Sequence, residues 1–136
     1  ERALRYGKED RLPLMLDDTI TFFSRLTEGA YTGIAFQKNG MKVQRKDGTT
    51  FFPNELSQAT VEQLYIALRL AFVKNTADIV SMPILIDDGF VNFDEDRKNI
   101  MFTLLEELSE DVQVLFFTFD DACVQRFSQK QVYMLK

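Results

Sequence analysis

The 136-residue sequence contains no histidine, and this absence removes several kinds of catalytic site. Serine or cysteine nucleophiles activated by histidine, imidazole acid-base catalysis and histidine-containing zinc sites are all excluded. The single cysteine, Cys123, excludes an intramolecular disulfide and an all-cysteine zinc site, and it is consistent with the cytoplasmic location that we expect. Any proton transfer must therefore use carboxylates, lysine, tyrosine or water.

The sequence also lacks a long apolar run. Segments 64–73 and 112–119 are interrupted by polar residues and are far shorter than the ~20 residues that a membrane helix needs, so we expect no membrane partner. The 21 acidic and 16 basic residues give a formal charge of −5, which predicts no overall attraction to nucleic acid. Four basic residues gather on one expected hairpin, where such a group is usually a solvated face: Lys38, Lys42, Arg45 and Lys46.

The composition supplies enough apolar material for one packed domain, with 46% hydrophobic residues and 13 phenylalanines. Apolar spacing from Leu12 to Leu26 predicts a helix, with Pro13 in its first turn and Gly29 after its end. Two dipeptides, Asn39-Gly40 and Asp47-Gly48, are strong hairpin signals. They predict three antiparallel strands, near 31–38, 41–46 and 49–53.

From residue 60 onward helices alternate with strands, which predicts βα units and a mainly parallel sheet. The helix at 60–74 is apolar around most of its circumference, so we expect it to be buried on several sides. Thr60 and Gln63 have the spacing of a capping box at its start. The remaining expected elements are a buried strand at 82–86, a helix at 94–108, a strand at 112–119, a short helix at 121–128 and a strand at 131–135.

Two adjacent carboxylates, Asp87 and Asp88, directly follow the strand at 82–86. Ligands of α/β sheets bind at the carboxyl ends of the strands, so one acid could hold Mg²⁺ while the next orients or deprotonates water. The same two acids could simply end the strand and enter a loop. Their spacing leaves both interpretations open.

A second candidate is the segment Leu56 to Thr60 at the start of the 60–74 helix. Free backbone amides, the helix dipole and the Ser57 hydroxyl could bind a phosphate group. A cap at this position would stabilise the helix by roughly 1 kcal/mol without any ligand. The residues alone favour this purely structural interpretation.

Three runs in a fixed order resemble the C-terminal lobe of an ABC-type ATPase head. They are ELSQATVEQLYIALRLAF at 55–72, MPILIDDGFVNFDEDR at 82–97 and VQVLFFTF at 112–119. The resemblance is to the SMC, RecN and SbcC class, and above all to bacterial YhaN-like proteins with long coiled coils. The resemblance implies a coiled-coil stub or lead-in at 1–11 and the C-terminal lobe of the head at 12–136. The implied fold is α/β, with a mainly parallel sheet and flanking helices that follow a helix and a short antiparallel meander.

The resemblance assigns roles to residues that match the family motifs. Ser57, Gln58 and Ala59 match the signature motif, which would hold the γ-phosphate of the nucleotide bound to the opposite head. Asp87 ends the Walker B strand and would hold Mg²⁺ through water. Asp88 takes the position of the catalytic acid and would position the attacking water.

Further motif positions show where this sequence departs from the family. Asn92 and Asp94 match the D-loop, which would communicate across the dimer. Asp120 takes the switch position, where family members carry histidine, and Asp88 is one methylene shorter than the usual glutamate. Ala59 replaces the usual glycine of the signature. These departures put hydrolysis in doubt.

The resemblance implies ATP and Mg²⁺ as cofactors, and an ATPase that acts at a head-head interface in DNA repair or DNA maintenance. The implied partners are the N-terminal lobe of the same protein, a second head, DNA and, as a further option, an SbcD-like nuclease. The sequence contains no G-x-x-x-x-G-K-[ST] phosphate loop, and its Gly7-Lys8 pair lacks the surrounding residues. In the family this loop belongs to the N-terminal lobe, so the chain alone should be inactive.

Two alternatives remain open. The first is a degenerate head that dimerises without hydrolysing ATP, which Asp88, Asp120 and the absence of histidine favour. The second is a stand-alone carboxylate-metal phosphohydrolase that uses Asp87, Asp88, Asp94 and Asp96.

Overall fold

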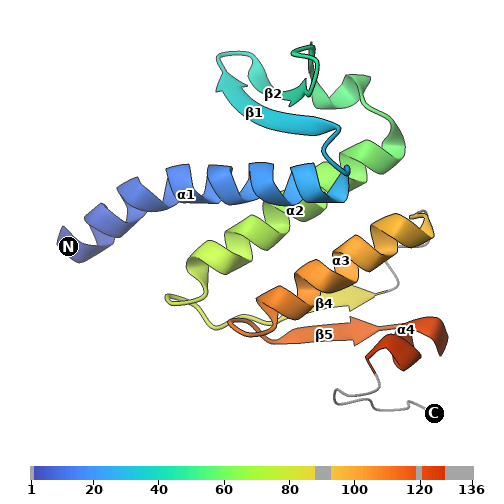
Figure 1. Cartoon of the computed structure of the whole chain (residues 1–136). Helices are drawn as coiled ribbons and strands as arrows, with labels where there is room; N and C mark the ends of the chain where they lie inside the picture. Colours follow the sequence, from blue (N-terminus) through green and yellow to red (C-terminus); the bar gives the residue numbers. More distant parts are fainter. Residues whose placement is uncertain (1, 88–92, 119–120, 128–136) are drawn as a thin grey trace.

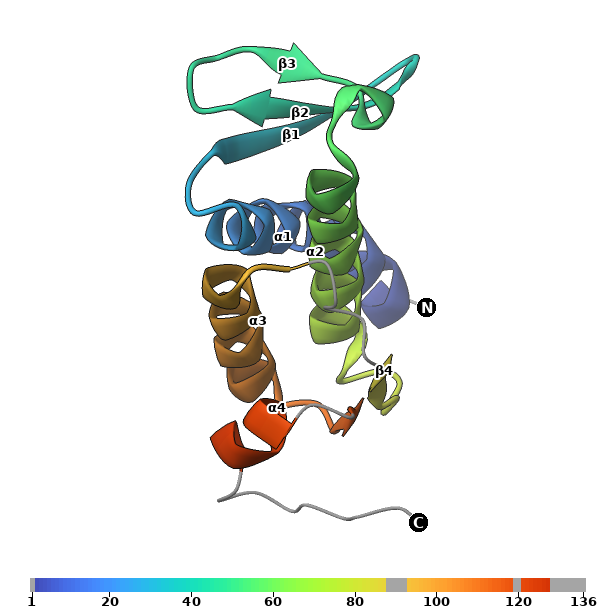
Figure 2. The same ribbon diagram turned by 90° about the vertical axis from the view of Figure 1, so that its right-hand side faces the viewer.

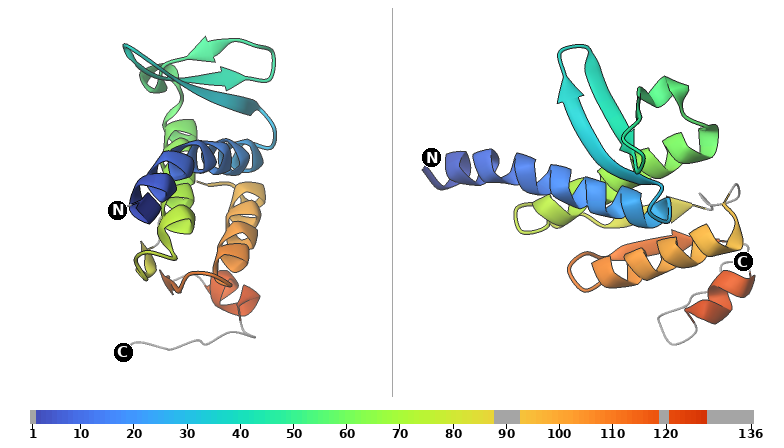
Figure 3. Two further views of the ribbon diagram at one scale, coloured as in Figure 1. Left: turned by 90° about the vertical axis from the view of Figure 1, so that its left-hand side faces the viewer. Right: turned by 45° about the horizontal axis from the view of Figure 1, so that its top comes forward.

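The computed structural model describes residues 2–87, 93–118 and 121–127 of the chain (Figure 1). Its elements follow one another as α1 (Arg2–Leu26), β1 (Tyr31–Gln37), β2 (Gly40–Arg45), β3 (Thr50–Phe51), a short 3-10 turn (Pro53–Glu55), α2 (Gln58–Thr76), β4 (Ile84–Asp87), α3 (Glu95–Leu108), β5 (Val114–Phe117) and α4 (Asp121–Arg126). The two views of Figure 3 show the antiparallel meander on one side of the α1–α2 pair, and α3 with the parallel strands on the other.

Helix α1 begins well before the position that its apolar spacing predicts. Pro13 lies inside the helix, so the prediction that placed it in the first turn is wrong. The helix continues through Pro13 although proline donates no amide hydrogen bond. The predicted end is confirmed: Gly29 has a φ of +81°, and its amide donates to the carbonyl of Ser24 at 2.8 Å.

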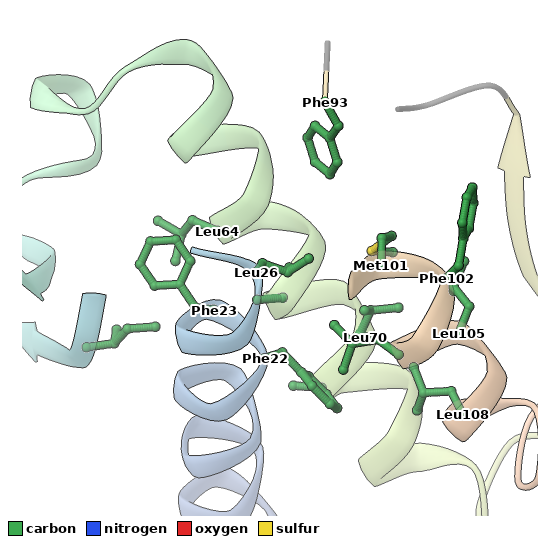
Figure 4. Packing of buried hydrophobic residues seen from close by; sticks show 14 of the residues in the cluster. Phe22, Phe23, Leu26, Leu64, Leu70, Phe93, Met101, Phe102, Leu105 and Leu108 are labelled. Atoms are coloured by element: carbon green, nitrogen blue, oxygen red, sulfur yellow. The ribbon is translucent and has the colours of Figure 1, made fainter. Parts of the chain in front are cut away.

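The core lies where α1 packs against α2. Figure 4 shows Phe22 and Leu26 of α1 directed toward α2, and Phe23 beside Leu64 of α2. Each is almost completely buried, and burial of one such side chain contributes roughly 2 kcal/mol. The buried apolar residues of the facing helices extend this core: Leu64, Ala67, Leu70 and Ala71 on α2, and Met101, Phe102, Leu104, Leu105 and Leu108 on α3.

A buried glutamine joins the same two helices. Gln63 of α2 is fully buried, and its Nε2 donates to the carbonyl oxygen of Leu26, the last residue of α1, at 2.8 Å. Carbonyls at the end of a helix lack partners within the helix, so this bond satisfies a group that packing would otherwise leave buried and unpaired. Among the described residues, Gln63 Oε1 has no hydrogen-bond partner.

Arginine and glutamate side chains join α1 to α3. Arg25, in the last turn of α1, donates from both terminal nitrogens to the carboxylate of Glu107, at 2.8 and 3.1 Å. Hydrogen bonding to this guanidinium lowers the pKa of Glu107 below its ordinary value. The pair is solvent-exposed and connects the end of α1 to the end of α3.

The predicted antiparallel meander is confirmed. Strand β2 pairs with β1 and with β3, so that Val43 lies opposite both Ile34 and Phe51. Figure 2 shows the three strands lying across the end of the α1–α2 pair. Both predicted hairpin glycines, Gly40 and Gly48, have positive φ angles of 118° and 91°.

The predicted parallel pairing is confirmed for β4 and β5, in the register Ile84 to Val114 through Asp87 to Phe117. Helix α3 connects these strands and covers one face of the pair, where the Phe102 and Phe116 rings lie 5.8 Å apart. The parallel sheet has two strands in the described residues and the antiparallel sheet has three, so a mainly parallel architecture is not established. The strand expected at 131–135 lies outside the described residues.

Two predictions of burial are wrong. Strand β4 alternates between half-buried and exposed residues, and Leu85 is 64% exposed. Helix α2 buries one face, whereas Tyr65 and Phe72 on other faces are about half exposed. The physical reason is that no described element covers the second face of the β4–β5 pair or the outer face of α2. Within the described residues, no helix is long and apolar enough to span a membrane.

The bond between Gln63 and Leu26 predicts a measurable loss of stability. Gln63→Leu keeps a buried side chain of similar size but leaves the Leu26 carbonyl unpaired, so we expect the free energy of unfolding to fall by about 1 to 3 kcal/mol. Urea denaturation measures this change. The matched control, Gln113→Leu, alters an exposed glutamine and should stay within about 0.5 kcal/mol of wild type. Equal effects of the two substitutions would contradict a special role for this bond.

Candidate functional site

The predicted site residues that are described lie on one side of the molecule. Figure 1 shows that α2 and α3 begin on the side toward which β4 and β5 point. Ser57 precedes α2, Asp87 ends β4 and Asp94 precedes α3. In open α/β sheets ligands bind beyond the carboxyl ends of the strands, so this side is the candidate site.

Ser57 is the N-cap of α2. Its exposed Oγ accepts a hydrogen bond from the Thr60 amide at 3.2 Å and lies 2.8 Å from Thr60 Oγ1. The predicted capping box of Thr60 and Gln63 is therefore wrong, because the helix begins one turn earlier and Gln63 points into the core. The pattern of Ser57 three residues before Thr60 was the signal for this cap.

Gln58 and Ala59 form the first turn of α2. The first amides of a helix have no partner within it and carry the positive end of its dipole. The Gln58 side chain is exposed, and its Nε2 donates to Glu62 at 3.3 Å, while Ala59 is half-buried. The start of α2 therefore presents a hydroxyl and main-chain donors that could bind an anion.

Asp87 is exposed at the carboxyl end of β4, opposite Phe117 of β5. Within the described residues, no three histidine, cysteine or acidic side chains form a group that could hold a metal. Mg²⁺ is commonly held by one or two carboxylates together with substrate phosphates and water. Asp87 could therefore serve as one ligand of Mg²⁺ in a site that a nucleotide completes.

Asp94 is the N-cap of α3. Its Oδ1 accepts a hydrogen bond from the Arg97 amide at 2.8 Å, and its Oδ2 lies 3.8 Å from Arg97 Nε. Glu95 and Asp96 follow in the first turn, where the helix dipole favours negative charge. Three other predicted site residues lie outside the described residues: Asp88, Asn92 and Asp120.

Sequence reasoning missed the contacts that fix α1 to the helices of this site. Gln63 is a polar residue within an otherwise apolar helix, and this exception was the available signal for its bond to Leu26. The pairing of Arg25 with Glu107 had no local signal, because 82 residues separate the two side chains.

Comparisons with known proteins agree with the resemblance stated above. No family model matches the chain. YhaN of Bacillus subtilis (strain 168), described as an uncharacterized protein, is 36% identical over 135 residues, which make up 97% of this chain and 14% of YhaN. The chain thus spans about one-seventh of the length of this relative.

Solved structures show the same fold. An SMC ATPase structure, from work on ATP-driven dimerization and DNA-stimulated activation, superposes with a TM-score of 0.64 at 14% identity, over 80% of this chain and 69% of its own. The SMC head domain from Thermotoga maritima gives a TM-score of 0.60 at 16% identity, over 88% of this chain and 44% of its own. The chain therefore has an α/β fold like that of SMC head domains.

The capping bond of Asp94 gives a test that is separate from any role in a dimer. Asp94→Ala should lower the free energy of unfolding by about 1 kcal/mol, whereas Asp94→Asn should retain most of the cap. Chemical denaturation of the two variants measures the difference. If both variants were as stable as wild type, Asp94 would not stabilise α3 as the hydrogen bond indicates.

Proposed function

We propose that this chain is the C-terminal lobe of an ABC-type ATPase head, and that the complete head binds and hydrolyses ATP at an interface with a second head. The observation that carries this proposal is the common placement of Ser57 and Asp87, at the start of α2 and the end of β4, in a fold like that of SMC heads. The N-terminal lobe of the same protein would supply the phosphate-binding loop that this sequence lacks.

The start of α2 would act on the nucleotide of the opposite head. Ser57 is exposed and its Oγ accepts from the Thr60 amide, so its hydroxyl proton would be donated to a phosphate oxygen instead of to Thr60 Oγ1, which lies 2.8 Å away. The amides of Gln58 and Ala59 would add two donors, and the helix dipole favours the negative charge. Each head would thus complete the other head's site.

The end of β4 would act on the nucleotide of its own head. Asp87 would hold Mg²⁺ through water, and Asp88 would position or deprotonate the attacking water. Bound Mg²⁺ would supply positive charge that offsets the charge of the phosphates. Asn92 and Asp94 would lie at the head-head interface, and Asp120 would lie at the switch position.

The open apolar face of the β4–β5 pair supports the assignment of a second lobe. Leu85, Leu115 and Phe117 lie on the face away from α3, with exposed fractions of 64%, 36% and 42%. Adjacent apolar residues on two paired strands are typical of a surface that another element covers. We propose that the N-terminal lobe covers them.

DNA is the second partner of the proposed complex. The SMC ATPase structure with a similar fold comes from work on ATP-driven dimerization and DNA-stimulated activation, and these words apply to that protein. We propose the same two properties for the complete head that contains this chain, with a role in DNA repair or DNA maintenance.

A degenerate head is the second candidate. Asp88 is one methylene shorter than the glutamate that the family uses, and Asp120 places a carboxylate where the family has an imidazole. A carboxylate close to a γ-phosphate repels it. Such a head would retain the fold and the dimer contact without turnover.

The apolar face predicts that the chain associates with itself when the other lobe is missing. Sedimentation of the purified chain should show association, and addition of the N-terminal lobe should give a single species of uniform mass. Replacement of Leu85 and Phe117 by serine should reduce self-association and also weaken capture of the lobe, because the same face serves both. A monomeric chain that does not bind the N-terminal lobe would contradict the two-lobe assignment.

Two substitutions separate hydrolysis from head joining in the reconstituted head. Asp88→Asn keeps the shape but removes the charge, so hydrolysis should fall by about 10² to 10⁴ while ATP binding and dimerisation persist. Ser57→Arg should block ATP-dependent dimerisation and leave ATP binding by one head intact, because a bulky cation would occupy the trans contact. Hydrolysis assays, nucleotide titrations and light scattering measure these three properties.

The control Gln113→Arg adds the same cation at the opposite end of the parallel strands, on an exposed side chain, and should change none of the three properties. The chain without its N-terminal lobe should show no hydrolysis. Hydrolysis at background level in the reconstituted head, with Asp88→Asn unchanged in affinity and dimer lifetime, would favour the degenerate head. Turnover by the chain alone that depends on Asp88 would favour the phosphohydrolase.

A further inference from the structure

We propose that the outer face of the antiparallel meander binds the phosphate backbone of duplex DNA. This face, called the basic face below, is defined by Lys38, Lys42 and Lys46 together with Gln44. This proposal names the surface that binds the DNA partner of the proposed function. The contact requires neither ATP nor a second head. Failure of the ATPase assignment would therefore leave it intact.

Charge is distributed unevenly along the chain. Residues 31–52 contain four lysines and arginines and a single acid, Asp47, although the whole chain has five more acids than bases. Asp47 is engaged by Arg45, whose terminal nitrogen lies 2.6 Å from its carboxylate. Lys38, Lys42 and Lys46 form no ion pair within the described residues. The meander is thus locally positive in an acidic protein, and the nearby Glu55 carboxylate at its edge accepts from the Phe52 amide at 2.7 Å.

The strand register places two of these groups on the face opposite the core. Successive side chains of a strand point to opposite faces. Val43 is fully buried against the core, so its neighbours Lys42 and Gln44 face outward. Lys38 lies in the turn between β1 and β2 and Lys46 directly follows β2, and both are exposed.

The outer face carries small residues on β1. Lys42 lies opposite Ala35 and Gln44 lies opposite Gly33, so β1 contributes small residues beside the longer side chains of β2. A Cβ atom added at Gly33 would lie 3.0 Å from Gln44 Oε1, so the glycine allows the Gln44 side chain to lie close to β1. Amide and ammonium groups on one face are donors that can contact phosphate oxygens.

The aromatic residues favour contact with the backbone over contact with bases. Lys42 Nζ lies 4.6 Å from the centre of the Phe52 ring, and the two form a cation–π contact. The lysine therefore covers one face of the ring, and a base cannot stack on that face. Phe36, near the end of β1, is 65% exposed. Within the described meander, no other large apolar side chain is exposed to this extent. Single-stranded DNA is typically bound on several stacked aromatic rings, and membrane surfaces by several apolar side chains.

The test is a titration of fluorescent duplex DNA with the 136-residue chain, followed by anisotropy without nucleotide. Binding should weaken steeply between ~50 and ~200 mM salt, because each phosphate contact releases counterions. The double variant Lys38→Gln with Lys46→Gln should bind more weakly and lower the slope of log affinity against log salt by about two. Lys42→Met keeps an aliphatic side chain over Phe52 and should lower the slope by about one.

The control is Arg69→Gln with Lys74→Gln, which removes the same formal charge from α2, where Lys74 is paired with Asp18 at 3.2 Å. It should leave the salt slope unchanged, and circular dichroism should show all variants folded. The proposal would be overturned if the folded wild-type chain did not bind duplex DNA at ~50 mM salt. It would also be overturned if the control lost as much affinity for duplex DNA as the lysine variants. Lysine-dependent binding to phosphatidylserine vesicles without binding to duplex would overturn it in favour of a membrane surface.

Discussion

The packing of α1 against α2 is the contact on which the rest of the structure depends. Two fully buried alanines of α2, Ala67 and Ala71, lie one helical turn apart on a helix that packs against α1. Polar contacts fix the pair near both ends: Gln63 bonds to Leu26, and Asp18 accepts from Asn75 at 2.8 Å. This rigid pair determines where α2 begins, and therefore where Ser57 lies.

The α1–α2 pair also separates two surfaces of opposite character. Figures 2 and 3 show the meander on one side of this pair and the β4–β5 pair on the other. The meander is basic, whereas the β4–β5 pair leaves apolar side chains exposed. Polyanions are attracted by the first kind of surface, and a protein lobe is favoured by the second. The proposed DNA contact and the proposed lobe contact can therefore be made at the same time.

Features with local signals could be predicted from the sequence. Asn39-Gly40 set the β1–β2 hairpin through the positive φ of Gly40, and Asp94 marked the start of α3 through its side-chain cap. The start of α1 was missed because Pro13 suits a first turn yet is tolerated inside this helix. Exposure of Leu85 was missed because an apolar run does not show whether its cover lies within the same chain. Of the candidate site, Ser57 precedes a helix and Asp87 ends a strand, and their roles toward a nucleotide stay predictions.

The proposal that each head completes the other's nucleotide site is tested most directly by a crystal structure. The reconstituted head would be crystallised with Mg²⁺ and a non-hydrolysable ATP analogue. We expect a two-fold dimer in which Ser57 Oγ of one head lies about 3 Å from a γ-phosphate oxygen of the nucleotide on the other. A nucleotide-bound head without this contact, with Ser57 serving only as the cap of α2, would contradict the proposal.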